Sequence, residues 1–358
     1  MRIGLIAGPG FPVPPLTYGG IERVVDTLAR GFAAAGHEVL LAAPSDSSCP
    51  VPLAAGMQQS NSTKLGAIPR EVSHIIRAYK AMGGMDVIHD HTLIGPLYAH
   101  RPLQIPTFAT MHGRLSTEEA DIYRAMSSNT NILAISHDQI RHASDLRVTR
   151  VIHHGMELSS VPVGTGKGGY ACFLGRMCPD KGVLEAIQIA QSAGIPLRIA
   201  AKMREPAELE YFHEVVRPVL SGEDELIGEI DDPDKFELLG NAVALLCPLQ
   251  WPEPFGLVMI EALATGTPVI GTASGAAPEI VDNGVTGYLA PVEELAGLLP
   301  LAGTLDRAAC RATAEERFSA RRMVADHLDV YWEILTHGSI GTPGRSAASR
   351  QTYRRDRG

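Results

Sequence analysis

Short apolar segments alternate with longer amphipathic segments along almost the whole chain, and this pattern restricts the possible folds more than any other feature. The first apolar segment covers 3–7. It is followed by a loop rich in Pro and Gly, a helical pattern that begins near Ile21 and ends at Gly36, and a second apolar segment at 37–44. A strand, a helix and a strand at this spacing form a βαβ unit with parallel strands. We therefore expect parallel sheets with helices on both faces.

The alternation runs in two series. The first contains four further candidate strands, DVIHDH, PTFATMH, NILAIS and RVIHHGM, and a segment at 46–69 that is expected to be a long loop. The second contains the candidate strands YACFLGR, PLRIAA, ELIGEI, AVALLCP, PVIGT and GYLA, with helices predicted near 182–193, 206–220 and 254–264. The glycine-rich stretch VGTGKGG separates the two series. This organisation predicts two doubly wound α/β domains that face a cleft, where ligands bind at the carboxyl ends of the strands.

The expected domain limits follow from these series. The first domain covers 1–163 and the second covers 164–314. A helix over 315–336 comes next, with Val324, Leu328, Tyr331 and Leu335 on its apolar face. The segment 337–358 is basic and is expected to be disordered.

Composition excludes several classes of protein. The chain has 358 residues, enough for about two domains. Its formal net charge of -9 disfavours a general nucleic-acid binder, so local cations and amides must hold any anionic ligand. The five cysteines include no CxxC pair, which predicts reduced thiols and a cytoplasmic location. The first apolar run is too short for a signal peptide, and no run is long enough to span a membrane.

The most informative motif is WPEPFGLVMIEALATGTPVI in the second half. Seven residues separate Glu253 from Glu261, and eight residues of helix rise about 12 Å, too far for a retaining-glycosidase pair. The two carboxylates suit instead the two ends of one elongated ligand. Pro254 is expected at the start of the helix. The amides of Phe255, Gly256 and Leu257 then form a cluster of donors suited to hydroxyl or phosphate oxygens.

A second motif, GRMCPDKG, places two cations at the end of a predicted strand. Arg176 follows the strand and Lys181 comes five residues later at the start of a helix. Such a pair can hold a diphosphate, Arg through its planar fork and Lys as a point charge, although surface cations are the ordinary alternative.

The first domain adds candidates at its own strand ends. Gly19 and Gly20 precede a helix, where backbone can approach a ligand closely, and His112 stands where PTFATM ends and should face the cleft. Pro9 and Val13 break a dinucleotide fingerprint. His89 and His91 are two residues apart on a predicted strand and therefore lie on the same face, where they could bind a metal ion. A contact with substrate or with loop backbone is the favoured interpretation. No nucleophile elbow, HExxH or Walker A motif occurs.

With these motifs the sequence resembles glycosyltransferase family 4, whose members have the two-domain GT-B arrangement. The resemblance covers nearly the whole chain, through YGGIERVV, MHG, GRMCPDKG and EPFGLVMIEALATGTPVI. It implies a retaining transferase that uses a nucleoside diphosphate sugar as co-substrate, with no other cofactor. One departure is visible, because Ala200-Ala201-Lys202-Met203 stands where many members have a glycine-rich turn facing the donor.

The resemblance also implies a role for each motif residue. Arg176 and Lys181 would bind the donor diphosphate, and Glu261 the ribose hydroxyls. Glu253 and His112 would lie against the donor sugar, His112 near the anomeric carbon. The remaining contacts would come from Ile230 to the nucleobase, from Gly19 and Gly20 to the diphosphate or acceptor, and from the amides of Phe255, Gly256 and Leu257. The last helix would cross back onto the first domain.

The expected chemistry is front-face attack by an acceptor hydroxyl, with the departing phosphate taking its proton and no metal required. Two other functions remain open from the residues: a sugar-nucleotide epimerase or hydrolase of the same architecture, and a non-catalytic sugar-nucleotide-binding protein. The sequence contains no pattern that identifies the acceptor, the donor base and sugar, or the oligomeric state.

Overall fold

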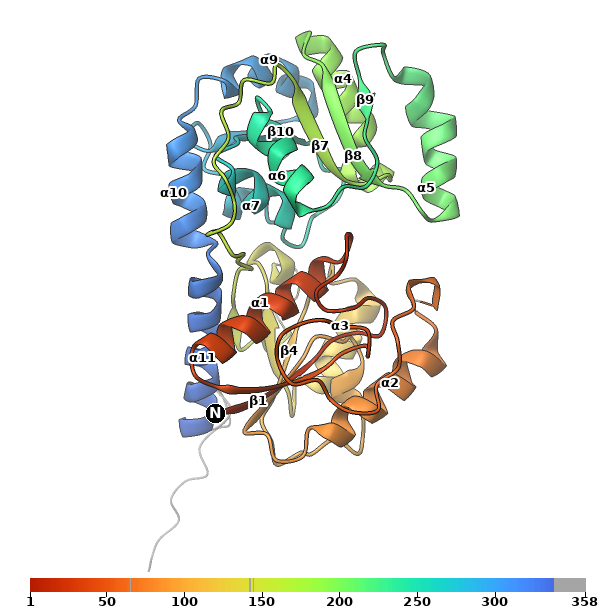
Figure 1. Ribbon diagram of the computed structural model, residues 1–358, viewed down its shortest axis with the longest axis vertical. Coiled ribbons are helices and arrows are strands. Elements are labelled where there is room, and N and C mark those ends of the chain that lie inside the picture. The colour runs from red at the N-terminus through yellow and green to blue at the C-terminus, as the bar shows by residue number, and fades with distance from the viewer. Residues whose placement is uncertain (65, 142, 144, 338–358) are drawn as a thin grey trace, which may run out of the picture.

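The computed structural model describes residues 1–64, 66–141, 143 and 145–337. Two parallel sheets form two Rossmann-like domains, one above the other in Figure 1, as the alternating pattern predicts. The expected basic tail lies almost entirely in 338–358, outside the described residues.

The first domain is a six-stranded sheet in the order β2-β1-β3-β4-β5-β6, with every neighbouring pair parallel. The central strands are buried because helices cover both faces, which explains their continuous apolar runs. The strands are β1 Arg2–Ile6, β2 Glu38–Ala42, β3 Val87–Asp90, β4 Thr107–Thr110, β5 Asn131–Ala134 and β6 Arg150–Val151. The α-helices are α1 Gly20–Ala34, α2 Ile68–Ala81 and α3 Thr117–Met126.

The second domain repeats the plan in the order β12-β11-β10-β7-β8-β9. The chain turns from one side of β7 to the other, so a crevice opens at the carboxyl ends of β7 and β10. The strands are β7 Ala171–Arg176, β8 Leu197–Lys202, β9 Glu225–Leu226, β10 Leu245–Cys247, β11 Val269–Gly271 and β12 Gly287–Leu289. The α-helices are α4 Val183–Ala193, α5 Pro206–Tyr211, α6 Asp232–Asn241, α7 Leu257–Ala264, α8 Ala277–Ile280 and α9 Val292–Ala302.

Two helices close the described chain and run along one side of the molecule (Figure 1), α10 Arg307–Arg317 and α11 Ala320–His337. The single helix expected over 315–336 is therefore interrupted at 318–319, where Phe318 is buried and Ala320 N–H bonds to the carbonyl of Met156. α11 packs on the first domain, and Met323, Val324, Val330, Tyr331 and Ile334 join the core under α1. Leu335 is 36% exposed, so its expected place on the apolar face is wrong.

Two local expectations also need correction. The segment expected to be a loop, 46–69, packs along β2, where Leu41 exchanges backbone hydrogen bonds with Pro52 and Ala54, and α2 begins at Ile68. The helix expected from Pro254 begins at Leu257, because Gly256 has a φ of 98° and breaks the helical path before it. Residues 253–256 therefore form a loop that presents backbone to the cleft.

Candidate active site

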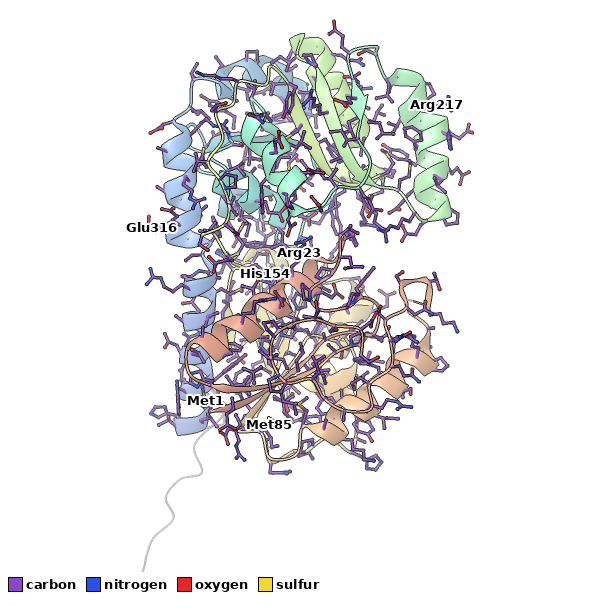
Figure 2. The ribbon with its side chains drawn as sticks, viewed as in Figure 1. Met1, Arg23, Met85, His154, Arg217 and Glu316 are labelled. Atoms are coloured by element: carbon purple, nitrogen blue, oxygen red, sulfur yellow. The ribbon has the colours of Figure 1, made fainter. Side chains whose placement is uncertain are left out.

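A cavity of about 380 Å³ lies between the two domains and is lined by both. Figure 2 shows Arg23 and His154, two of its lining residues, where the domains meet. Eleven residues singled out from the sequence line this one cavity: Gly19, Gly20, His112, Arg176, Lys181, Ile230, Glu253, Phe255, Gly256, Leu257 and Glu261. Arg176 ends β7 and His112 follows β4, so strand ends from both sheets meet here.

Arg176 is the cation of the cleft with the least protein bonding. Its side chain is half-buried, and no hydrogen bond or carboxylate partner is found for it among the described residues. It lies beside Lys202, its register partner on β8. A half-buried guanidinium without an anion provides a place for an anionic ligand.

Lys181 and Glu253 form an ion pair inside the cleft, and their side chains are 19% and 13% exposed. Oε2 of Glu253 also accepts a hydrogen bond from Trp251 Nε1 at 2.8 Å, and Lys181 Nζ lies 5.1 Å from the centre of the Trp251 ring. Oε1 of Glu253 makes no such bond in the described part of the chain. One carboxylate oxygen is thus committed to the protein while the other can accept from a ligand.

The loop before α7 supplies backbone donors. The N–H groups of Phe255, Gly256 and Leu257 have no acceptor among the described residues. The loop is held from behind, because Ala276 N–H bonds to the Glu253 carbonyl at 2.9 Å and a Cβ on Gly275 would lie 2.2 Å from Glu253 N. These amides stand at the positive end of the α7 dipole and suit phosphate or hydroxyl oxygens.

Glu261 is held by a chain of charges that crosses between the domains. Lys235 Nζ lies 2.5 Å from Glu261 Oε1 and 2.9 Å from Asp232 Oδ1. Asp232 in turn pairs with Arg23 of α1 at 2.5 Å. Burial favours the protonated acid, yet Lys235 and Arg23 outweigh it and hold the pKa of Asp232 below its usual value. Lys235, itself held by Asp232, therefore fixes the position of the Glu261 carboxylate before any ligand binds.

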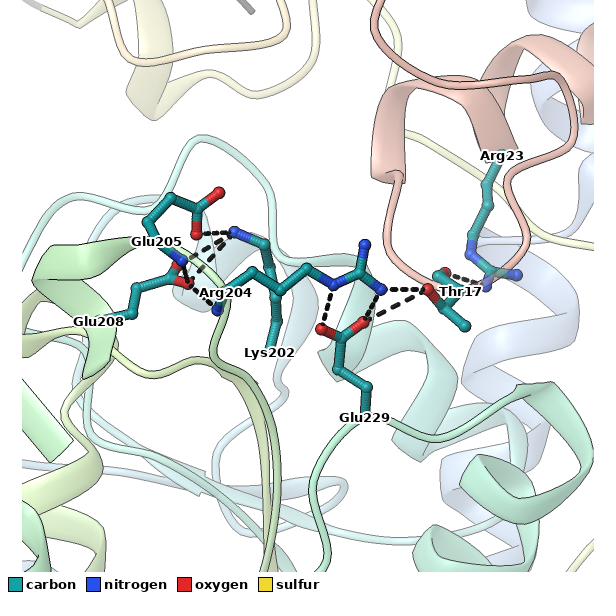
Figure 3. Close-up of polar contacts among 7 residues, drawn as sticks. All are labelled: Thr17, Arg23, Lys202, Arg204, Glu205, Glu208 and Glu229. Carbon is teal, nitrogen blue, oxygen red and sulfur yellow. Dashed lines mark hydrogen bonds and ion pairs between the residues drawn. The ribbon is translucent and has the colours of Figure 1, made fainter. Parts of the chain in front are cut away.

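A second polar link joins the domains through Arg204 (Figure 3). The guanidinium donates to Glu229 Oε1 at 2.6 Å and to Thr17 Oγ1 at 3.0 Å, and Thr17 donates to Glu229 at 3.3 Å. Beside it, Lys202 is buried and pairs with Glu205 and Glu208 (Figure 3). The stretch that departs from the family's glycine-rich turn thus extends β8 and carries a cation into the cleft.

His112 is packed among other rings. Its Nε2 lies 2.9 Å from Nδ1 of His91, and its ring stacks on His154 with centroids 5.4 Å apart. Burial lowers the pKa of His112 to about 3, with a smaller contribution from His327, so the ring is neutral near pH 7.

The His89-Asp90-His91 stretch binds protein groups in the structure. His89 contacts Tyr331 and Thr110 through its two ring nitrogens, and Asp90 accepts from Tyr79 and Thr92. Among the described residues no group of three or more His, Cys, Asp or Glu side chains is arranged to hold a metal ion.

Sequence reasoning did not assign a ligand contact to several lining residues, namely Thr17, Arg23, Lys202 and Lys235, whereas His154 belongs to the histidines that it placed at strand ends. Lys202 ends a strand, so the rule that ligands meet carboxyl ends could have found it. Lys235 lies inside α6 and Arg23 inside α1, where nothing in the local pattern distinguishes them from ordinary surface cations.

Two Rossmann-like domains that face each other over such a cleft define the GT-B class of glycosyltransferases. Residues 18–160 match the family model for Glycosyltransferase Family 4, and residues 162–299 match the model for Glycosyl transferases group 1. The chain therefore belongs to glycosyltransferase family 4 and is a glycosyltransferase.

Similar proteins agree with this assignment. A phosphatidyl-myo-inositol mannosyltransferase of Mycolicibacterium smegmatis is 28% identical over 98% of this chain and 98% of its own length. The crystal structure of AviGT4, a glycosyltransferase involved in avilamycin A biosynthesis, is 26% identical with a TM-score of 0.71, over 94% of this chain and 98% of that one. The complex of Anabaena HepE with UDP and glucose has a TM-score of 0.71 at 18% identity, over 92% and 98%. In the part of the chain that the structure describes, no helix is long and apolar enough to cross a bilayer.

Proposed function

We propose that this protein transfers a glycosyl group from a nucleoside diphosphate sugar to an acceptor hydroxyl, with retention of the anomeric configuration and without a metal ion. The observation that carries the proposal is Arg176, a half-buried guanidinium that has no carboxylate partner among the described residues and shares its cleft with Lys181. Two cations and a set of unpaired amides match the charge and the oxygen atoms of a diphosphate.

In the proposed complex the donor lies across the cleft in a single orientation. The diphosphate binds Arg176 and Lys181, and the α7 amides bind the oxygens of the phosphate and sugar. The ribose hydroxyls donate to Glu261, whose position is set by Lys235, and the nucleobase lies against the backbone at Ile230. The sugar then lies between Glu253 and His112, where the two domains meet.

The bonding of Glu253 argues for the front-face route. One of its oxygens is held by Lys181 and Trp251, and this anchoring suits a group that positions the sugar rather than one that attacks it. The acceptor hydroxyl then enters on the face from which the diphosphate leaves, and the departing phosphate oxygen receives its proton. Arg176 and Lys181 stabilise the charge that develops on that phosphate, and one preorganised donor of this kind contributes about 2.7 to 4 kcal/mol.

HepE supports the choice of donor class, because that protein shares the fold and was solved with UDP and glucose. The first experiment identifies the donor sugar and base, and then the acceptor. Melting temperatures are measured with UDP-, GDP-, ADP- and dTDP-sugars, and the nucleotide sugar that stabilises the protein most is then tried with acceptors.

Two further measurements test the stereochemistry and the metal-free route. We expect the anomeric proton coupling of the product to match that of the donor, and turnover to persist in EDTA. Loss of turnover in EDTA that Mg²⁺ or Mn²⁺ restores contradicts the metal-free route, and an inverted product contradicts retention. The absence of stabilisation by any nucleoside diphosphate contradicts the donor class.

A further inference from the structure

Behind the cleft, two histidines from neighbouring strands share a hydrogen bond. His91 follows β3 and His112 follows β4, and these strands pair in parallel, so their carboxyl ends lie side by side. Nδ1 of His91 lies 2.9 Å from Nε2 of His112. One of the two nitrogens must carry the proton and the other must accept it.

The second nitrogen of His91 decides which one donates. His91 is only 5% exposed, and its Nε2 is buried without a partner among the described residues. If His112 donated, Nε2 of His91 would carry a buried N–H with no acceptor. If His91 donates through Nδ1, its Nε2 keeps a lone pair instead. A buried N–H without an acceptor is rarer and more costly than an unused acceptor, so His91 is the donor.

The tautomer of His112 follows from this bond. Its Nε2 accepts, so the single proton of the neutral ring resides on Nδ1. Nδ1 has no partner in the described chain and is not among the buried unpartnered atoms, and the ring lines the cleft. The Nδ1–H group of His112 therefore faces the cleft and can donate a hydrogen bond to a ligand there.

The surroundings keep both rings neutral. Burial is the main cause that lowers the pKa values of His91 and His112, and the neighbouring titratable groups lower them further, because a second positive charge in the cluster would be repelled. Those groups are His89 on β3, His154 after β6 and His327 on α11, with Arg322 of α11 acting on His154. No carboxylate is among the groups that shift either ring. The position of the proton, rather than the charge, then determines what His112 can do.

We propose that His91 is a positioning residue that fixes His112 in the Nδ1–H tautomer, so that His112 donates a hydrogen bond to an oxygen atom of the donor sugar. This inference rests on the function proposed above, which places the donor sugar beside His112. In this tautomer, Nδ1 has no lone pair with which to take a proton from the acceptor hydroxyl. This agrees with a reaction in which the leaving phosphate takes it.

The first test reads the tautomer in the ligand-free protein. Full-length protein with ¹⁵N-labelled histidine is studied by long-range ¹H–¹⁵N correlation, and His112 is assigned from the signals lost in H112A. We expect a neutral ring at about pH 7 with its proton on Nδ1. A neutral ring protonated on Nε2 overturns the proposal, and this result does not depend on the folding of any His91 variant.

The second test compares two variants of nearly equal shape. H91N retains a side-chain N–H that can donate to His112 Nε2, whereas the carboxylate of H91D can only accept and moves the His112 proton to Nε2. At about pH 8.5 we expect the kcat of H91D to be about 10- to 100-fold below that of H91N, with a smaller change in donor KM.

The pH profile separates this role from a structural one. As the pH falls, His112 of H91D becomes an imidazolium beside the carboxylate and regains an N–H on Nδ1, so its turnover should recover towards about pH 6 relative to H91N. Equal kcat for H91D and H91N at the higher pH, or parallel profiles, overturns the proposal. If even the wild-type protein transfers no sugar, the proposed function fails, and the tautomer in the resting protein still decides this inference.

Discussion

At the scale of single residues, the cations of the cleft differ in how the protein holds them. Lys181 is paired with Glu253, Lys202 with Glu205 and Glu208, and Lys235 with Glu261. Arg176 is found without such a partner in the described chain, and Glu208 and Asp180 act on its charge only without a direct ion pair, so its guanidinium N–H groups remain available to an anion. This difference predicts which substitution affects binding without disturbing an internal ion pair.

Arg176→Ala should therefore impair donor binding while leaving the fold intact. We expect kcat/KM for the donor to fall about 10²- to 10³-fold, because one preorganised donor to the developing phosphate charge is lost. Melting temperature without ligand should change little. Arg217→Ala, on the far side of the second domain (Figure 2), is the matched control. Unchanged kcat/KM and donor affinity in the Arg176 variant contradict the diphosphate site.

The burial of Glu22 should make the stability of the folded protein depend on pH. It is 8% exposed in α1, and burial raises its pKa to about 7 from an ordinary value of 4.5. The folded protein thus binds the proton more tightly than the unfolded chain. The contribution of this proton to the free energy of unfolding is fully present below about pH 4.5. It falls by about 3 kcal/mol as the pH rises from about 4.5 to about 7.

Glu22→Gln should remove this dependence, because the amide cannot ionise. Free energies of unfolding in urea at about pH 5 and about pH 8 should differ less in the variant than in the wild type, and the variant should be the more stable at the higher pH. Glu214→Gln, at an exposed position, should leave the difference unchanged. A wild-type difference that survives in Glu22→Gln argues against a buried, uncharged Glu22.

At the scale of elements, the crossing of α1 and α11 ties the end of the described chain to the first domain. A Cβ added to Gly31 would lie 2.3 Å from Val324 Cγ2, so the two helices approach closely at this glycine. Phe32 and Tyr331 pack beside it with ring centroids 5.6 Å apart. The close approach explains why a flexible residue is tolerated inside α1.

Gly31→Ala should destabilise the protein by about 1 to 3 kcal/mol through overpacking, although alanine favours a helix. Val324→Ala in the same chain should relieve the clash, so the double variant should be more stable than the sum of the single effects allows. Urea unfolding of the four proteins measures this coupling. Gly297→Ala, in α9 with nothing within 4 Å of the added Cβ, is the control and should be neutral or stabilising. Strict additivity would mean that the helices are not in contact here.

At the scale of the whole molecule, several polar links join the domains around the cleft, and two of them are made by arginines. Arg23 pairs with Asp232, and Arg204 reaches Thr17 (Figure 3). A further link joins Glu279 of the second domain to His153 and to the backbone amides of His137 and Asp138 in the first. The side chains of Arg23 and Asp232 are 26% and 42% exposed, and pairs of this kind contribute at most about 1 kcal/mol each. The two arginine links can therefore bias the separation of the domains without governing the stability of either one.

The double variant Arg23→Ala/Arg204→Ala should consequently open the molecule without unfolding it. We expect a larger radius of gyration in solution scattering, a higher donor KM and more hydrolysis of donor relative to transfer, because a closed cleft excludes water. Arg30→Ala breaks an ion pair within α1 alone and should change none of these. Identical scattering and product ratios in the double variant would show that these links do not control closure.

Much of this architecture was predictable from local patterns. Apolar runs of strand length between helical periods define parallel sheets, and the carboxyl ends of those strands place Arg176 and His112 at the cleft. The helix start at Pro254 was predicted wrongly, because Gly256 adopts a positive φ next to a loop buttressed by the distant Gly275. Leu335 was assigned to the wrong face, because helical spacing alone does not show which of two apolar stripes meets α1.

The sequence by itself determined the two doubly wound domains and the motif residues at their strand ends, because periodicity, turn residues and motif spacing are properties of neighbours along the chain. Only the tertiary structure decided the contacts that prepare the cleft. Lys235 meets Glu261, Arg23 meets Asp232 and His91 meets His112 across separations of 26, 209 and 21 residues. Hydrogen bonds and ion pairs depend on separations of a few ångströms and on burial. Neither is set until the elements of a domain have packed together, and the pair of Arg23 with Asp232 also requires the two domains to meet.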